Sequence, residues 1–126
     1  MSTLIAYRNG IEFFRSSGSW LYPLLDLEQV LGASHRQNEP GSSLTTYDKV
    51  VGRAGALLSI RLGITAIRTD VVSELALETL AAHGVVINAL EVTPRILCAT
   101  EDLLRDVSDP EQAHRLILAR IEALRK

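Results

Sequence analysis

The stretch of sequence that decides the fold is Tyr47-Asp48-Lys49-Val50-Val51-Gly52-Arg53-Ala54-Gly55-Ala56-Leu57-Leu58. Its apolar residues recur at helical spacing, and the same pattern continues as far as Leu62, directly before Gly63. The spacing therefore predicts a helix from about Tyr47 to Leu62, with Thr45 or Thr46 as its N-terminal cap.

Charged and small residues are concentrated at the start of this predicted helix. Backbone N–H groups are unpaired there, and the positive end of the helix dipole favours an anion. One turn of helix would bring Lys49 and Arg53 together, so one interpretation is that they clamp an anionic group beside Asp48. The alternative is an ordinary capped helix with solvated basic side chains. Gly52 and Gly55 are expected to let the helix pack closely on a sheet.

Elements earlier in the chain are also predicted by their residues. Asn9-Gly10 between the apolar runs 4–7 and 11–14 predicts an antiparallel hairpin, because both turn residues need positive φ. A helix is expected from Trp20 to Leu31, and a long polar loop from 33 to 46. Trp20 and the nearby Tyr22 are expected to pack in the core, with the rim of a pocket as the alternative.

The second half of the chain alternates strands and helices. A strand at 64–69, a helix from a Ser73 cap to Ala82 and a strand at 85–89 form a βαβ unit, whose strands should be parallel. Residues 95–99 fit either a strand or a helical turn. Ser108-Asp109-Pro110-Glu111 predicts the start of the last helix.

Length and composition limit the function classes. The 126 residues predict a single domain spanning 1–126, and a hydrophobic content of 47% with 22% charged residues is typical of globular proteins. A formal net charge of −2 provides no basic surface for duplex nucleic acid or an anionic membrane. We expect neither a signal peptide nor a membrane span, and a cytoplasmic location.

Four pieces of sequence together resemble a known family: the Asn-Gly hairpin, the helix with Pro23-Leu24-Leu25, the Asp48–Ala54 segment and the Asp70–Glu74 segment. The chain resembles the small prokaryotic domain-of-unknown-function family numbered 1893. This resemblance implies an α/β fold of three layers (α/β/α), with a cytidine-deaminase-like mixed sheet that begins with an antiparallel hairpin. It also implies that the helix starts holding Asp48 and Ser73 face each other.

The resemblance does not imply deaminase chemistry. Catalytic deaminases hold zinc with a His or Cys near a Glu on one helix and a Pro-Cys-x-x-Cys on the next. This chain has a single Cys, Cys98, and three scattered His residues, so no metal and no cofactor are expected. Relatives tend to carry Cys-Pro-x-Glu where this chain has Asp109-Pro110-Glu111, which argues against thiol chemistry.

Three hypotheses about function follow from these patterns. The first is binding of a nucleotide or other small anionic ligand at the paired helix starts. The second is a group-transfer or hydrolytic enzyme that uses Asp48 as the catalytic residue at the same site. The third is a module that forms a homodimer and has no small-molecule site. For four of the candidates, the alternative to ligand binding is that they cap a helix start: Asp70, Ser73, Glu74 and Asp109. The candidate ligand-binding residues are Asp48, Lys49, Gly52, Arg53, Asp70, Ser73, Glu74 and Asp109.

Overall fold

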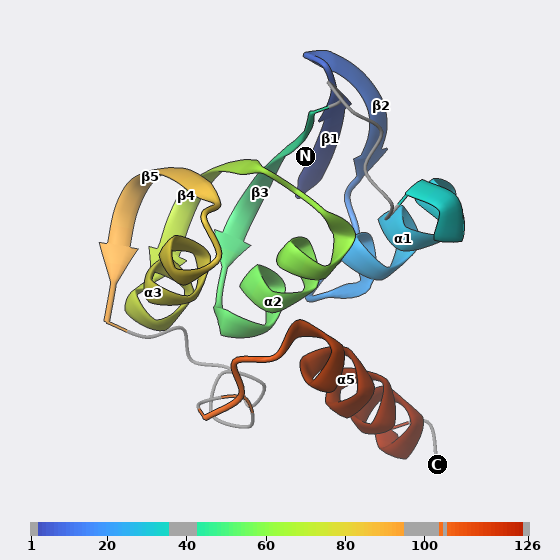
Figure 1. Ribbon diagram of the computed structural model, residues 1–126, viewed down its shortest axis with the longest axis vertical. Helices are drawn as coiled ribbons and strands as arrows, with labels where there is room; N and C mark the ends of the chain where they lie inside the picture. Colours follow the sequence, from blue (N-terminus) through green and yellow to red (C-terminus); the bar gives the residue numbers. More distant parts are fainter. Residues whose placement is uncertain (1–2, 36–42, 95–103, 105, 125–126) are drawn as a thin grey trace.

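The computed structural model describes residues 3–35, 43–94, 104 and 106–124 (Figure 1). The described part contains five strands and four helices, and none of these helices is long and apolar enough to cross a membrane. In chain order the elements are β1 (Leu4–Arg8), β2 (Ile11–Ser16), α1 (Tyr22–His35), β3 (Leu44–Val51), α2 (Arg53–Leu62), β4 (Ala66–Ser73), α3 (Glu74–Ala82), β5 (Val86–Thr93) and α5 (Pro110–Leu124).

The strands form one mixed sheet in the order β2-β1-β3-β4-β5. β1 pairs antiparallel with β2 and β3, whereas β3, β4 and β5 are parallel. The hairpin prediction is confirmed: Asn9 and Gly10 have φ values of 52° and 84°. The mixed α/β sheet that starts with this hairpin is consistent with the predicted three-layer, cytidine-deaminase-like class.

The βαβ unit and the last helix are also confirmed. β4 and β5 are parallel and flank α3, which ends at Ala82 as predicted. The Ser73 hydroxyl accepts a hydrogen bond from the N–H of Ala76, so Ser73 is the cap. α5 begins at Pro110. The ambiguous segment 95–99, with Cys98, lies outside the described residues.

The prediction for the deciding stretch was wrong in its first half. Residues 44–51 form β3, and α2 begins only at Arg53 after a Gly52 cap. Thr45 and Thr46 are therefore strand residues and cap nothing. The β-branched residues of this segment favour an extended backbone, and β1 and β4 complete its hydrogen bonds on both sides.

The boundaries of neighbouring elements also differ from the prediction. α1 continues to His35 instead of ending before Gly32, so the predicted loop at 33–46 begins later and ends at β3; its residues 36–42 are outside the described part. β4 extends to Ser73, so Asp70 lies in a strand.

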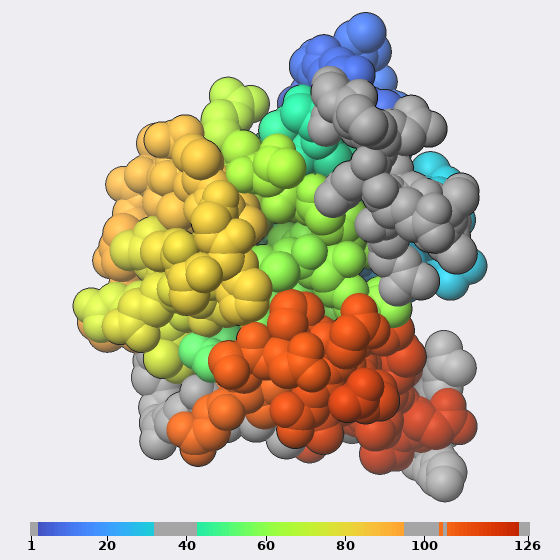
Figure 2. All heavy atoms as spheres, viewed as in Figure 1, coloured from blue at the N-terminus to red at the C-terminus, as the bar shows by residue number. Residues whose placement is uncertain are grey.

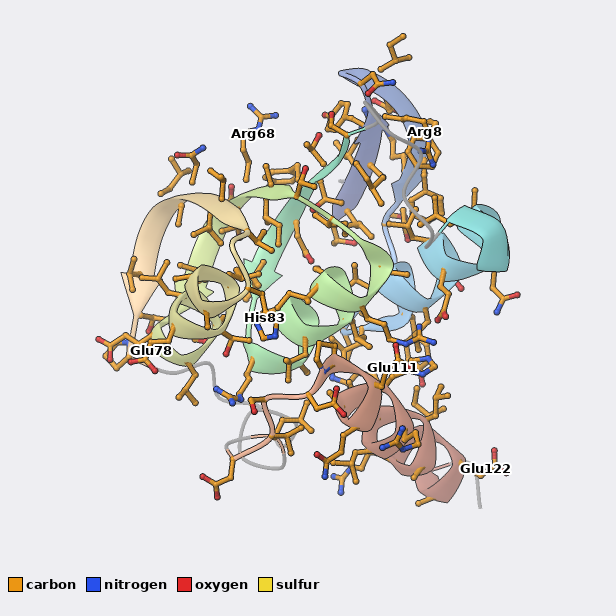
Figure 3. All side chains as sticks on the ribbon, viewed as in Figure 1. Arg8, Arg68, Glu78, His83, Glu111 and Glu122 are labelled. Atoms are coloured by element: carbon orange, nitrogen blue, oxygen red, sulfur yellow. The ribbon has the colours of Figure 1, made fainter. Side chains whose placement is uncertain are left out.

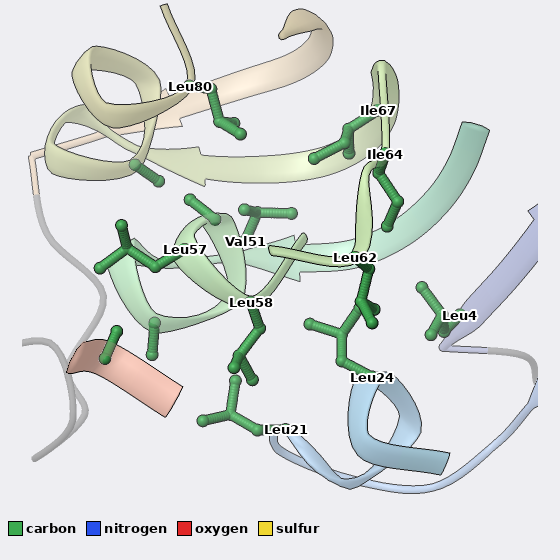
Figure 4. Close-up of a cluster of buried hydrophobic side chains, with 14 of the residues drawn as sticks. Leu4, Leu21, Leu24, Val51, Leu57, Leu58, Leu62, Ile64, Ile67 and Leu80 are labelled. Atoms are coloured by element: carbon green, nitrogen blue, oxygen red, sulfur yellow. The ribbon is translucent and has the colours of Figure 1, made fainter. Parts of the chain in front are cut away.

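The strand register assigns residues to the two faces of the sheet. Ala6, Thr46, Ile67 and Ile87 lie side by side in one row that is buried or partly buried beneath the helices. Leucines of α1 and α2 meet this face and form the centre of the core (Figure 4). Figure 2 shows α3 and α5 on the outside, with α2 residues visible between them.

An ion-pair network fixes the helices relative to one another. The Arg61 guanidinium of α2, which is 7% exposed, pairs with Glu28 of α1 and Glu111 of α5. His114 of α5 also approaches Glu28, at 3.3 Å. The network therefore holds α1 against α2, and the starts of these two helices form the pocket described next.

Candidate functional site

A pocket of about 430 Å³ lies where β3 ends and α1 and α2 begin. Its size falls within the range typical of small-molecule sites, about 300–1,000 Å³. The sequence predicted a site formed by the starts of the helices holding Asp48 and Ser73. The structure instead uses the start of α1, and Ser73 is not part of the lining. The lining residues are Thr3, Ser17, Gly18, Ser19, Trp20, Leu21, Pro23, Leu24, Asp48, Lys49, Val50, Gly52, Ala54 and Gly55.

One wall of the pocket is apolar and comes from the segment that leads into α1. Trp20 has a φ of 56°, a left-handed conformation that a bulky residue rarely adopts. Its ring packs edge-on against Tyr22, with the ring centroids 5.4 Å apart. Trp20 therefore lines the pocket, which was the alternative interpretation of this residue.

The start of α2 forms a second wall. Gly52 is the N-cap residue, and among the described residues no side chain caps this end, in contrast to α3 with its Ser73 hydroxyl. Gly52, Ala54 and Gly55 all line the pocket, so the first turn of α2 borders the cavity. A Cβ atom on Gly55 would meet its nearest neighbours at 3.9–4.0 Å, which is ordinary contact. Close packing therefore does not require glycine at position 55.

Asp48 is the titratable acid in the pocket lining. It pairs with Leu4 and Thr69 in the sheet, which puts it on the face covered by the helices. Loss of solvent raises the pKa of its carboxyl group from 3.8 to about 7, although the N–H groups of Val50 and Lys49 donate to the carboxyl and lower the pKa. Near neutral pH this group both gives up and takes up a proton.

The structure brings three of the predicted site residues together, namely Asp48, Lys49 and Gly52. Arg53 is not among the lining residues. Its guanidinium donates from Nε and Nη2 to the Val107 carbonyl, at 2.9 and 2.6 Å, and from Nη1 to the Thr79 hydroxyl at 3.0 Å. Because Lys49 belongs to a strand and Arg53 to a helix, they are not neighbours on one helical turn, and that part of the clamp interpretation was wrong.

The remaining candidates lie elsewhere. Asp70 accepts a hydrogen bond from the Tyr47 hydroxyl at 2.9 Å. Glu74 is exposed in the first turn of α3, directly after the Ser73 cap. Asp109 accepts from the N–H of Glu111 at 3.3 Å, at the start of α5. Ser73 and Asp109 therefore have the geometry of helix caps, which was the alternative interpretation of these two residues.

The lining residues that were not selected as binding residues are Val50, Ala54 and Gly55, together with Thr3 and residues of the segment 17–24. Thr3 and this segment precede β3 by at least 20 residues and reach the pocket because β1 pairs beside β3. The nearest sequence signal was the pair Trp20 and Tyr22 beside a Ser-Gly turn. Among the described residues, no group of three His, Cys, Asp or Glu side chains is arranged to hold a metal ion.

Comparison with known proteins gives a family for this chain. A model of the TM1506 family, described as a domain of unknown function (DUF1893), matches residues 2–121. The crystal structure of a DUF1893 family protein, TM1506 from Thermotoga maritima, superposes with a TM-score of 0.79 at 28% sequence identity. That match covers 94% of this chain and 80% of the other. A search of curated proteins returns no match. The family match spans nearly the whole chain, and the chain belongs to the DUF1893 family.

Proposed function

We propose that the pocket between α1, β3 and α2 binds a nucleotide or another small anionic ligand. The observation that carries the proposal is the uncapped start of α2, which opens into a pocket that Lys49 also lines. Unpaired N–H groups at a helix start bind anions, and a basic residue in the pocket lining favours an anion as well. The anionic group is placed at the first turn of α2.

The opposite wall supports a ligand that has an apolar or planar part as well. Trp20, Leu21 and Leu24 present apolar surface to the cavity. A nucleobase or a similar ring covers such a surface while its phosphate lies at the helix start. This arrangement matches the usual composition of small-molecule sites, in which a mostly apolar pocket has a few polar groups that fix the orientation.

Binding of a doubly charged anion should depend on pH. Asp48 with its pKa of about 7 is neutral in acid and charged in base, and a charged carboxylate in the lining repels the anion. We therefore expect the affinity for inorganic sulfate, which does not titrate in this range, to fall as the pH rises from 6 to 8. In an Asp48→Asn variant the affinity should hardly change with pH. Isothermal titration calorimetry at both pH values measures the difference.

The anion site itself is tested by giving α2 its own cap. The backbone of Gly52 has a φ of −99° and a ψ of −177°, which any residue adopts, so a Gly52→Asp variant places a carboxylate on the free N–H groups. We expect this variant to be more stable by only a few tenths of a kcal/mol, because glycine is already a tolerated N-cap residue, and to bind AMP and sulfate at least tenfold more weakly. Thermal shift and calorimetry provide the two readouts.

Two further variants make this test specific. Gly52→Ala adds a Cβ without an acceptor and should keep most of the affinity. Lys49→Ala should weaken binding without the gain in stability. If wild-type protein binds AMP, sulfate and pyrophosphate no better than the Gly52→Asp variant does, the proposed ligand class is wrong.

Catalysis at the same pocket is the second candidate, and the titration of Asp48 favours it. A carboxyl group with a pKa near the working pH suits general acid–base chemistry in group transfer or hydrolysis. Once a ligand is known, Asp48→Asn should abolish its turnover while leaving its binding intact. A variant that keeps its turnover would remove Asp48 from the chemistry.

A further inference from the structure

On the second face of the sheet, opposite the buried row of Ala6, Thr46 and Ile67, described side chains of β4 and β5 are exposed, and we call this surface the open face. Direct cross-strand pairing puts Tyr47, Arg68 and Asn88 side by side in one row of this face. Arg68 and Asn88 are exposed, and Figure 3 shows Arg68 extending away from the molecule. The leucines of α1 and α2 meet the other, buried face of the sheet.

Large apolar side chains stand on the open face along β5. Val86 and Leu90 are 59% and 86% exposed, and they lie on the same face of the strand as Asn88 because successive residues alternate between faces. Parallel strands are normally covered on both faces. At the carboxyl ends of β3 and β4, Val51 and Val72 pair with each other and are fully buried in the core, so the exposed area does not extend to them. The uncovered area is therefore a defined patch, centred on β4 and β5.

We propose that this patch is the docking surface for a second copy of the chain, with the two sheets packed face to face around a two-fold axis. A two-fold contact requires a surface that is complementary to itself. Arg68 and Asp70 satisfy this requirement: they lie two residues apart on β4, on the same face, with opposite charges. After a two-fold rotation, Arg68 of each copy faces Asp70 of the other.

The composition of the patch also favours a protein partner. Tyrosine and arginine are enriched at the energetic centres of interfaces, and here Tyr47 and Arg68 are direct neighbours, with the exposed Leu90 on the adjoining strand β5. An extended polyanion such as single-stranded nucleic acid is a poorer match, because Asp70 lies within the patch and the chain carries a net charge of −2.

The first test is the mass of the intact chain in solution. Sedimentation velocity over a series of concentrations should show a dimer. A Leu90→Asp variant should dissociate it, raising the dissociation constant about a hundredfold, because a carboxylate would be buried without a partner. Because the Leu90 side chain is exposed in the single chain, the substitution should not affect the stability of the monomer. At a concentration where both proteins are monomers, the variant and the wild type should therefore have the same melting temperature.

Leu118→Asp is the matched control. Leu118 is also an exposed leucine, at 44%, but it belongs to α5. The Leu118→Asp variant should remain a dimer. A wild-type chain that is monomeric at every concentration overturns the proposal, and so does a Leu90→Asp variant that dimerises as well as wild type.

A charge-swap experiment then identifies the partner as a second copy with the stated pairing. Arg68→Asp gives one chain two acids in the patch, and Asp70→Arg gives another chain two bases. Each variant alone should be a monomer, because like charges would meet across the axis. An equimolar mixture should form a one-to-one heterodimer. If each variant alone dimerises as wild type does, or if the mixture stays monomeric, the two-fold pairing of Arg68 with Asp70 is wrong.

Discussion

Replacing Asp48 with Asn should make the protein more stable at pH 8. The side chain keeps its shape and an oxygen that accepts backbone N–H bonds, but it no longer carries a charge in a place that has lost most of its solvent. Each factor of ten in proton affinity corresponds to about 1.4 kcal/mol, so a rise in pKa from 3.8 to about 7 sets an upper limit of about 4 kcal/mol. Because Asp48 is partly exposed, we expect about 2 kcal/mol.

The sign of the effect follows from the proton balance. The folded chain has the higher pKa, so between pH 3.8 and about 7 it binds more protons at Asp48 than the unfolded chain does. The free energy of unfolding of the wild type therefore falls as the pH rises through this window, and the loss is complete above it. Asn titrates nowhere in this range. The two proteins should have nearly equal stability at pH 4 and differ most at pH 8.

Urea denaturation of both proteins at pH 4, 6 and 8, followed by circular dichroism, measures this difference. Asp26→Asn is the control, since it makes the same chemical change at an exposed position of α1. Destabilisation of the Asp48→Asn variant by the same amount at all three pH values would mean that the carboxyl group supports the fold through its hydrogen bonds.

A carboxyl group that costs stability is informative about function. A neutral residue at position 48 would be more stable, so the charge has its use outside the fold itself. Asp48 lies in the pocket lining, next to Lys49 and the open start of α2. The proximity of these three features supports a ligand site in the pocket more strongly than any one of them does alone.

Local signals in the sequence correctly predicted the elements that depend on them. Asn9-Gly10 gave the hairpin because the turn needs two positive φ values, and Ser73 and Pro110 gave the starts of α3 and α5. Alternating strand and helix gave the parallel pairing of β4 and β5. The turn and the two helix starts are encoded within a few residues each, and the strand-helix-strand unit within one contiguous segment of the chain.

The helix prediction for 47–52 was wrong because a strand between two others is determined by distant partners. Nothing within Tyr47–Val51 shows that Leu4 and Ala66 will pair with this region from either side. Over so short a run, the spacing of its apolar residues fits the period of a helix as well as that of a strand. Of the eight candidate residues selected from the sequence, Asp48, Lys49 and Gly52 line the pocket, whereas the α1 wall of the pocket depends on tertiary packing.

The role of Arg53 also depends on residues that are distant in the sequence. A basic residue in the first turn of a helix has the same sequence pattern whether it binds a ligand or a carbonyl group 54 residues away. The guanidinium of Arg53 connects the start of α2 with Thr79 of α3 and with Val107, which precedes α5. Its role in the structure is to join these three parts of the chain.

Arg53→Ala should therefore destabilise the fold by about 3 kcal/mol. Hydrogen bonds from a charged group contribute about 1.5–3 kcal/mol each, and here both the Val107 carbonyl and the Thr79 hydroxyl lose their charged donor. Arg53→Lys should recover less than half of this loss, since an ammonium group cannot reproduce the planar fork. Urea denaturation gives the change in stability, and Arg120→Ala, an exposed arginine of α5, is the control.

The same variant separates a structural arginine from one that binds ligand. If Arg53 joins the elements as the hydrogen bonds indicate, the folded Arg53→Ala protein at low temperature should still bind AMP and sulfate, with an affinity close to that of the wild type. Full stability combined with lost binding would restore the clamp of Lys49 and Arg53 around the anion. The two outcomes differ in both readouts, because the stability of the joint depends on Val107 and Thr79 while the binding site depends on Gly52 and Lys49.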